Sequence, residues 1–147
     1  VRVHEGFITV VRGGQNVPIA FSSVKAGESP LLGDWKQVVG GRGARISCRV
    51  RSAKPGGRVM IEIFASDVGS WQFETKTAFA NDWQEAAAEL RYDWSDDEAR
   101  AVGWKRAANG FSWRETIQNI GKLVVVPGAV GTQASFDLDD VRVSGVE

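Results

Sequence analysis

The chain has 147 residues, of which 43% are hydrophobic and 24% charged, a length and composition typical of one globular domain. Its 18 basic and 18 acidic side chains balance, so the sequence carries no electrostatic signature of binding to nucleic acid or to an anionic membrane. No apolar run reaches the roughly 20 residues needed to span a bilayer, and we therefore expect a single domain over 1–147 with neither of these partners.

Period-two alternation of apolar residues between turns predicts β-strands along most of the chain. In chain order, strands are expected at 6–11, 17–21, 44–51, 58–64, 71–79, 83–91, 117–126 and 135–143. Residues 22–43, rich in Gly, Ser and Pro, are expected to be mostly loop, and the turn at 54–57 predicts a hairpin between the third and fourth strands. The pattern predicts an all-β fold, a two-sheet antiparallel β-sandwich (jelly roll) of about eight to ten strands.

The segment 93–115 interrupts this alternation with turn-forming residues. Ser95 followed by Glu98 is a capping-box pattern, which predicts a short helix over about 95–101. Trp113, Ile117 and Ile120 follow a three-to-four spacing, so we expect them to share one buried face.

Cysteine and histidine each occur once, as Cys48 and His4. A single cysteine allows no disulfide within the chain, and one residue of each kind excludes the usual zinc sites. A Ser-His-Asp triad would have to use His4, and no nucleophile-elbow motif is present. Cys48 lies in an alternating apolar run, which favours a buried structural thiol over a nucleophile.

Six tryptophans stand against one tyrosine, and tryptophan serves either to fill cores or to stack on flat ligand faces. Trp83 opens a strand and is expected to plug the core, and the parity of Trp71 with Phe73 also favours the core. Trp94 and Trp104 have polar, loop-like neighbours and are the better ligand platforms. Folding back as a lid over the core is an equally good interpretation of these two.

The segment "WRETIQNIGKLVVVPGAVGTQASFDLDDVRVSG" resembles the C-terminal signature of jelly-roll carbohydrate-binding modules in the galactose-binding-like superfamily. That family closes with a strand of the form aromatic-x-Leu-Asp-Asp-Val, which residues 136–141 match. The segments "GARISCRVRSAKPGGRVMIEIF" and "NDWQEAAAEL" are similar to a hairpin and to a tryptophan-led strand of the same group, so the resemblance covers residues 44–145.

The resemblance implies a non-catalytic module, covalently linked to a catalytic domain in a parent protein, that binds a polysaccharide or oligosaccharide. Such a module raises the local concentration of its enzyme at the glycan. It also implies a secreted or extracellular location. The sequence begins at Val1 without a signal-peptide pattern, so we expect an excised domain or a processed protein, and the expectation of secretion comes from the resemblance alone.

Leu138 and Val141 are both expected in the core, although their odd spacing would place them on opposite faces of a regular strand. A β-bulge near Asp139 and Asp140 would restore the register and free oxygen atoms that suit a hard cation. The resemblance implies a structural calcium ion against this last strand. Asp139 is the first candidate ligand, Asp140 the second and Glu5 a weaker third, and a bulge without metal is the alternative.

Sugar rings have apolar faces and polar edges, so a binding site needs aromatic platforms beside hydrogen-bonding groups. One expected surface is the polar face of the central sheet, with Arg49, Arg51, Met60, Glu62, Phe64, Gln72, Glu74 and Lys76. The other is the irregular segment at the sandwich edge, with Arg91, Tyr92, Trp94, Trp104 and Lys105. The candidate carbohydrate-binding residues are Trp94, Trp104, Tyr92, Arg91, Trp71, Arg49 and Glu62.

Two other classes of function remain open. A small jelly-roll glycosidase or lyase would pair Glu62 with Glu74 across adjacent strands, but arginines mixed among these acids argue against dedicated catalytic roles. A structural or protein-interaction sandwich of a multidomain enzyme is the other alternative, since a fold does not dictate function. We expect a domain that is not an enzyme. Acidic glycans are possible ligands, because guanidinium groups bind carboxylates and sulfates well.

Overall fold

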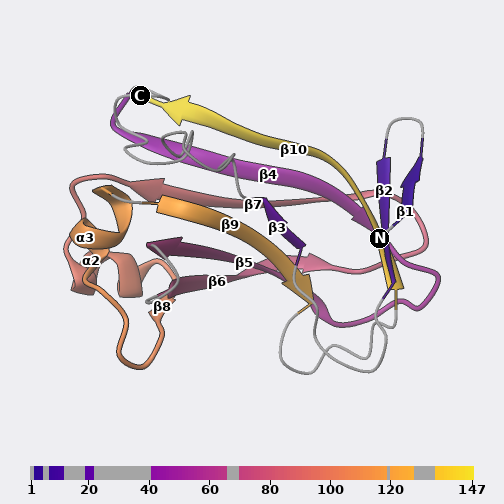
Figure 1. Cartoon of the computed structure of the whole chain (residues 1–147), viewed down its shortest axis with the longest axis horizontal. Helices are drawn as coiled ribbons and strands as arrows, with labels where there is room; N and C mark the ends of the chain where they lie inside the picture. Colours follow the sequence, from indigo (N-terminus) through magenta and orange to yellow (C-terminus); the bar gives the residue numbers. More distant parts are fainter. Residues whose placement is uncertain are drawn as a thin grey trace.

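The computed structural model describes residues 2–4, 7–11, 19–21, 41–65, 70–118, 120–127 and 135–147. Most of this chain is β-strand, with two short helices near the middle of the sequence (Figure 1). The strands are β1 (Arg2–His4), β2 (Phe7–Val11), β3 (Ile19–Phe21), β4 (Gly43–Arg51), β5 (Arg58–Ala65), β6 (Ser70–Ala78), β7 (Gln84–Arg91), β8 (Trp104–Arg106), β9 (Ile120–Pro127) and β10 (Ser135–Val146). The helices are α2 (Asp96–Ala101) and α3 (Trp113–Gln118).

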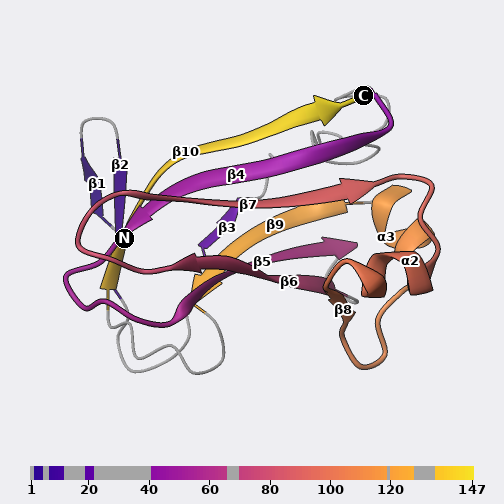
Figure 2. The same ribbon diagram turned by 180° about the vertical axis from the view of Figure 1, so that it is seen from behind.

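Two antiparallel sheets lie one above the other and form a β-sandwich (Figures 1 and 2). Sheet A has the strand order β1-β2-β10-β4-β7, and sheet B has the order β3-β9-β5-β6-β8. The chain passes repeatedly from one sheet to the other, as in a jelly roll, and the predicted all-β sandwich is confirmed. The ten strands of the described chain lie within the expected range.

Strands β4 and β5 do not form the hairpin that the sequence predicted. β4 pairs with β10 and β7 in sheet A, whereas β5 pairs with β6 and β9 in sheet B. The turn at 54–57 therefore carries the chain across the sandwich, with Gly56 and Gly57 at φ of 114° and 69°. Positive φ favours glycine in a hairpin and in a crossover alike, which is why the turn residues did not distinguish the two.

Alternate residues of the strands fill the space between the sheets. The inward residues of β4 and β5 are at most 1% exposed, as their alternation predicted: Ile46, Cys48, Val50, Val59, Ile61 and Ile63. Ala86 and Ala88 are buried in the same way on β7. Their weak β propensity is overridden because β7 pairs along β4 from Gln84 to Arg91.

Strand β10 contains the bulge that the spacing of Leu138 and Val141 predicted. Its register with β4 shifts between Asp139 and Arg142, and Asp140 has a φ of 53°. Leu138 is buried and Val141 packs, partly buried, against the core. The extra residue of the bulge thus lets both side chains reach the same core.

The predicted irregular segment forms α2, β8 and α3, which lie together at one end of the sandwich (Figure 1). α2 begins at the predicted capping box, in which Ser95 Oγ accepts from the Glu98 N–H at 3.2 Å and Glu98 Oε2 accepts from the Ser95 N–H at 2.7 Å. Ser112 and Glu115 make the same reciprocal pair at the start of α3. Neither of these helices, nor any other in the described part of the chain, is long and apolar enough to cross a membrane.

Candidate functional site

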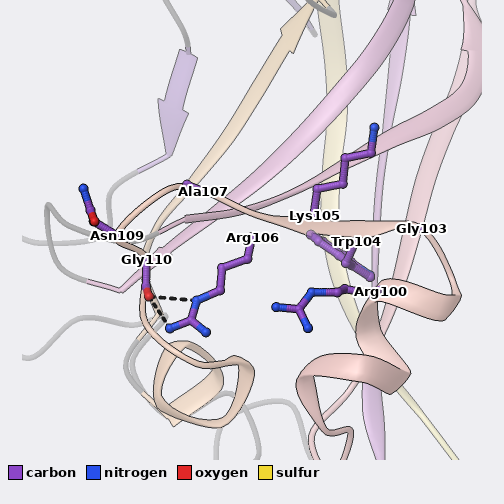
Figure 3. Close-up of a pocket in the computed structure, with 8 residues that line it drawn as sticks. All are labelled: Arg100, Gly103, Trp104, Lys105, Arg106, Ala107, Asn109 and Gly110. Atoms are coloured by element: carbon purple, nitrogen blue, oxygen red, sulfur yellow. Dashed lines mark hydrogen bonds between the residues drawn. The ribbon is translucent and has the colours of Figure 1, made fainter.

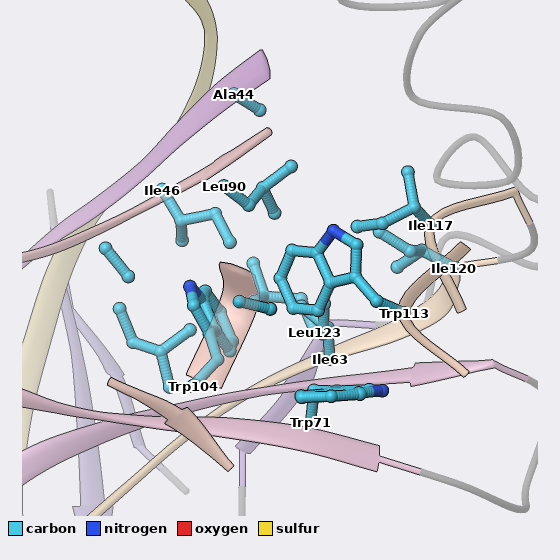
Figure 4. Close-up of a cluster of buried hydrophobic side chains, with 13 residues drawn as sticks. Ala44, Ile46, Ile63, Trp71, Leu90, Trp104, Trp113, Ile117, Ile120 and Leu123 are labelled. Carbon is cyan, nitrogen blue, oxygen red and sulfur yellow. The ribbon is translucent and has the colours of Figure 1, made fainter. Parts of the chain in front are cut away.

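Four tryptophans gather at the end of the sandwich covered by the two helices. The ring centroid of Trp113 lies 5.2 Å from Trp71, 5.2 Å from Trp104 and 5.7 Å from Trp94. Trp71, Trp104 and Trp113 are completely buried in the cluster that Figure 4 shows. Trp104 therefore has no ring face for a ligand, and its predicted role as a platform is wrong. Trp71 is likewise a core residue, which excludes it as a sugar-binding platform.

The buried indole N–H groups are satisfied by backbone carbonyls, as buried donors must be. The bonds run from Trp71 to Phe111 at 3.0 Å, from Trp104 to Glu89 at 2.9 Å and from Trp113 to Arg91 at 2.8 Å. Glu89 and Arg91 lie on β7 of sheet A, whereas Trp71 and Trp104 lie on sheet B. The three indoles thus attach the helical end to both sheets, which explains why polar neighbours did not keep them at the surface.

The other predicted residues of this segment keep part of their surface in solvent. Trp94 and Tyr92 are half-buried and pack against the core cluster. Arg91 is half-buried on β7, and the Tyr92 N–H donates to the Arg42 carbonyl at 3.2 Å. Trp94, Tyr92 and Arg91 therefore remain candidates for contact with a ligand.

The outer face of sheet A carries pairs of opposite charge. Arg51 Nε lies 2.6 Å from Asp137 Oδ2, and Arg49 Nη1 lies 3.8 Å from Asp139 Oδ2. The guanidinium carbons of Arg51 and Arg49 lie 4.4 Å and 5.1 Å from the ring centre of Trp83. Trp83 is half-buried outside the sheet and is not the predicted core plug. Its indole instead binds two cations through cation–π contacts.

The sequence predicted one polar face that carries both Arg49 and Glu62, but in the structure these residues lie on two different faces. Arg49 points outward from sheet A, and Glu62 points outward from sheet B on the opposite side of the sandwich. Glu62 is half-buried, and this burial raises the pKa of its carboxyl group above the ordinary value. Glu62 faces Gln72 in the register, so Glu74, which faces Met60, is its diagonal neighbour.

The carboxylates of the β10 bulge interact with arginines. Asp139 Oδ1 accepts from the Asp140 N–H at 2.7 Å, its Oδ2 lies near Arg49, and Asp140 Oδ1 accepts from Arg142 Nε at 2.6 Å. Within the described ranges, no three His, Cys, Asp or Glu side chains gather as a metal-binding group. Glu5 lies outside the described residues. Calcium takes six to eight oxygen ligands, so these two carboxylates would need further ligands to hold it.

A pocket of about 560 Å³ opens beside β8, and we call it the β8 pocket. Its lining residues are Arg100, Gly103, Trp104, Lys105, Arg106, Ala107, Asn109 and Gly110. Figure 3 shows the Arg100 guanidinium directed toward Arg106 and the Arg106 guanidinium directed toward Gly110, whereas Lys105 leaves the ribbon in another direction. The volume lies within the roughly 300–1,000 Å³ of small-molecule sites.

Arg106 is held firmly in this pocket. Its Nε donates to the Gly110 carbonyl at 2.8 Å, and its Nη2 donates to the same oxygen. Its Nη1 donates to Asp96 Oδ2 at 3.0 Å, and Asp96 Oδ1 in turn accepts from the Trp113 N–H at 2.7 Å. The guanidinium is thus fixed between the 107–110 turn and the starts of both helices.

Arg100 is held more loosely than Arg106. Its Nη1 lies 3.1 Å from Asp97 Oδ1 one turn back in α2, but the Asp97 side chain is 94% exposed. Its guanidinium carbon also lies 5.8 Å from the ring centre of Trp71. An exposed ion pair of this kind contributes little and exchanges readily with solvent.

Gly103 lines the pocket, and two exposed apolar residues are next in sequence to lining residues. Gly103 has a φ of 115°, and an added Cβ would lie 3.1 Å from Phe73 Cε2, so glycine is required there. Val102 precedes Gly103 and Phe111 follows Gly110, and their side chains are 49% and 40% exposed. They are the large hydrophobic residues of the described chain that remain exposed.

The sequence located this site only in part. Lys105 and Trp104 were assigned to it, but Arg100 and Arg106 were missed, although two arginines within a seven-residue stretch of the expected edge segment were a visible signal. The fold defines the chain as an all-β sandwich domain. Comparison with known proteins takes the assignment no further, since no family model, curated protein or solved structure matches the chain significantly.

Proposed function

We propose that the chain is a non-catalytic carbohydrate-binding module and that the β8 pocket is its binding site. The observation that carries the proposal is an open pocket of about 560 Å³ lined by cationic donors, with the exposed aromatic residue Phe111 directly following the lining residue Gly110 in the chain. Sugar recognition requires this combination, because a pyranose ring is apolar on its faces and rich in hydroxyl groups at its edge. The resemblance of residues 44–145 to jelly-roll modules supports the same function.

Asn109, which lines the pocket, and Phe111, which follows the lining residue Gly110, offer two complementary properties. Phe111 is 40% exposed directly after Gly110, and its carbonyl is fixed by the Trp71 indole N–H. Its ring would cover one face of a sugar. Asn109 lines the pocket, and its backbone has a φ of 62°. Its side-chain amide can both donate to and accept from hydroxyl groups.

In the full-length protein, the module would act by targeting. We propose that it is joined to the catalytic domain of a larger, secreted glycan-active enzyme and holds that enzyme at a polysaccharide or oligosaccharide. Tethering makes the second encounter intramolecular, so the effective substrate concentration rises without new catalytic groups. The proposal gives the domain itself no catalytic residue.

A structural or protein-interaction domain of a multidomain enzyme is the second candidate. One observation favours it: Trp71, Trp104 and Trp113 all serve to pack the core, so the tryptophan bias of the sequence does not by itself indicate a ligand. A small glycosidase or lyase would need Glu62 and Glu74 to act as a pair. Incubating the domain with each glycan tested below and assaying for reducing ends and for unsaturated products checks that alternative.

Affinity electrophoresis across neutral and acidic polysaccharides tests the proposal. At least one glycan should retard the wild-type domain. Phe111→Ala should weaken that retardation about 2- to 12-fold, the factor that corresponds to the loss of one aromatic contact. The control is Lys76→Ala, which removes an exposed side chain from the outer face of the same sheet.

Three outcomes separate the possibilities. Loss of retardation in Phe111→Ala but not in Lys76→Ala supports the β8 pocket, and the reverse would move the site to the face of sheet B. No retardation on the whole panel would overturn the module and favour the structural candidate. A parallel series with a calcium chelator checks the predicted calcium ion: the chelator should lower the melting temperature of the wild type but not of Asp139→Asn.

A further inference from the structure

Two guanidinium groups line the β8 pocket, and none of its lining residues is an acid. Figure 3 shows the Arg100 guanidinium directed toward Arg106, whose own guanidinium turns to the Gly110 carbonyl. Each guanidinium has five N–H donors. The hydrogen bonds to described residues use three donors of Arg106 and one of Arg100. Both guanidiniums therefore line one pocket and keep donors that these bonds do not use, and an anion would offset the repulsion between their like charges.

The charged residues that line the pocket are all positive, and Glu115 of α3 lies near enough to Arg106 to interact with its charge. Arg100 pairs with Asp97 and Arg106 pairs with Asp96, but Lys105 makes no ion pair with a described residue. Both acids belong to the start of α2 and neither lines the pocket. Arg100, Lys105 and Arg106 are the charged lining residues, so the pocket favours an anion over a neutral ligand of the same shape.

Arg106 is also positioned before a ligand arrives. Two bonds to the Gly110 carbonyl and one to Asp96 fix Arg106. Arg100 lies over the immobile, buried ring of Trp71, and it can exchange its exposed partner Asp97 for a ligand. A guanidinium fixed in advance loses little entropy on binding. It also fits the paired oxygens of a carboxylate or sulfate by two parallel hydrogen bonds.

From this geometry we infer that Arg100 and Arg106 of the β8 pocket bind one oxyanion of an acidic glycan, the carboxylate of a uronic acid or a sulfate ester. The inference rests on the proposed function and narrows its ligand class. The molecule carries no net charge, so the attraction acts at short range in the pocket and gives no long-range field for polyanions in general.

Matched pairs of glycans test the inference, because each pair differs only in the anionic group. Polygalacturonate is compared with its fully methyl-esterified form, and dextran sulfate is compared with dextran. The wild type should bind the acidic member of at least one pair about tenfold or more tightly, since charge-assisted hydrogen bonds are lost with the neutral member. A preference in the first pair identifies a carboxylate, and a preference in the second identifies a sulfate.

Arg100→Gln is the main variant, because the Arg100 side chain is half-exposed and the substitution should leave the fold intact. It should weaken binding of the preferred acidic glycan about tenfold or more. Arg114→Gln is the control, since it removes the same charge from an exposed position on α3 that does not line the pocket. It should change binding less than about twofold.

Arg106→Lys is a second test that keeps the charge but removes the planar fork. It should also weaken binding, and a melting curve checks its fold, since Arg106 bonds to Gly110. Equal losses in Arg100→Gln and Arg114→Gln would overturn the inference in favour of general charge attraction. Equal binding of acidic and neutral glycans would overturn it while leaving the proposed function intact, and absence of binding to every glycan would overturn both.

Discussion

Cys48 shows how burial determines the chemistry of a single residue. Its side chain is 1% exposed on β4, in a cluster with Val50, Val59 and Phe136. Burial raises the pKa of the Cys48 thiol to about 12, and the negative charge of Glu85 adds to the effect. Because the thiolate is the reactive form, the group is inert at neutral pH, as its alternating position in the sequence predicted.

Thiol labelling checks this conclusion. At about pH 8, a disulfide reagent should modify Cys48 in the native protein only as fast as the protein opens, and it should modify the urea-unfolded chain at once. Because the folded state holds the thiol proton more tightly, the associated stability is complete below pH 9, the ordinary pKa, and is lost as the pH rises toward 12. Rapid modification without a change in circular dichroism would contradict a buried thiol.

At the residue scale, the sequence predicted the buried positions of the long strands better than it predicted the burial of Trp104. Alternation fixes the face of a strand residue, so the burial of Ile46 and Ile61 followed from local pattern. An indole outside the main strands reaches across segments that are distant in sequence. Trp104 is buried because its ring packs against Trp113 and its N–H reaches Glu89, contacts that its polar neighbours in sequence do not indicate.

The start of α3 carries a capping box that stabilises a helix of only six residues. Ser112 Oγ accepts from the Glu115 N–H at 3.2 Å, and Glu115 Oε2 accepts from the Ser112 N–H at 3.0 Å and the Ser112 hydroxyl at 2.9 Å. These bonds favour the ionised carboxylate and lower the pKa of Glu115. Its stabilising contribution is therefore present above the ordinary pKa and lost as the pH falls.

Ser112→Ala should lower the free energy of unfolding by about 1 kcal/mol near neutral pH, the usual effect of losing an N-cap side chain. The difference from the wild type should shrink in acid, where Glu115 becomes protonated. Urea unfolding at several pH values measures both effects. Ser144→Ala, at an exposed position of β10, is the control, and a pH-independent loss in Ser112→Ala would contradict the role of Glu115.

At the scale of elements, local patterns predicted the strands but not all of their partners. The capping box at Ser95 and the bulge at Asp139 were predictable because the residues involved are close in sequence. The partners of β4 are β10 and β7, which are distant in sequence, and two alternating strands joined by a glycine turn are compatible with one sheet or with two. Strand pairing depends on contacts across the whole sandwich, which the turn sequence does not specify. The predicted hairpin was therefore wrong.

At the scale of the whole molecule, the candidate site also depends on contacts between residues that are distant in sequence. Arg106 lies on β8 and Arg100 on α2, and their presence in one pocket depends on how the tryptophan cluster packs that end onto both sheets. The sequence predicted an edge site rich in aromatic and basic residues within this segment. It could not predict which arginines line the pocket, because side-chain direction in an irregular segment follows from tertiary contacts.

Trp113 connects the helical end with both halves of the sandwich. Its ring packs against Trp71 and Trp104 of sheet B, and its N–H donates to the Arg91 carbonyl of sheet A. A residue that bridges both sheets couples their unfolding, so the domain should unfold in one cooperative transition. Urea curves from tryptophan fluorescence and from far-ultraviolet circular dichroism should then coincide.

Trp113→Phe tests this coupling because it keeps an aromatic ring but removes the N–H donor and part of the buried volume. It should lower the free energy of unfolding by about 2–4 kcal/mol while the two curves still coincide. Trp94→Phe is the matched control, since Trp94 packs on the same ring from a half-exposed position and should cost about 1 kcal/mol or less. If the two substitutions cost the same, or if Trp113→Phe separates the fluorescence and dichroism curves, Trp113 is not the residue that joins the sheets, and the arginines of the β8 pocket must be positioned by other contacts.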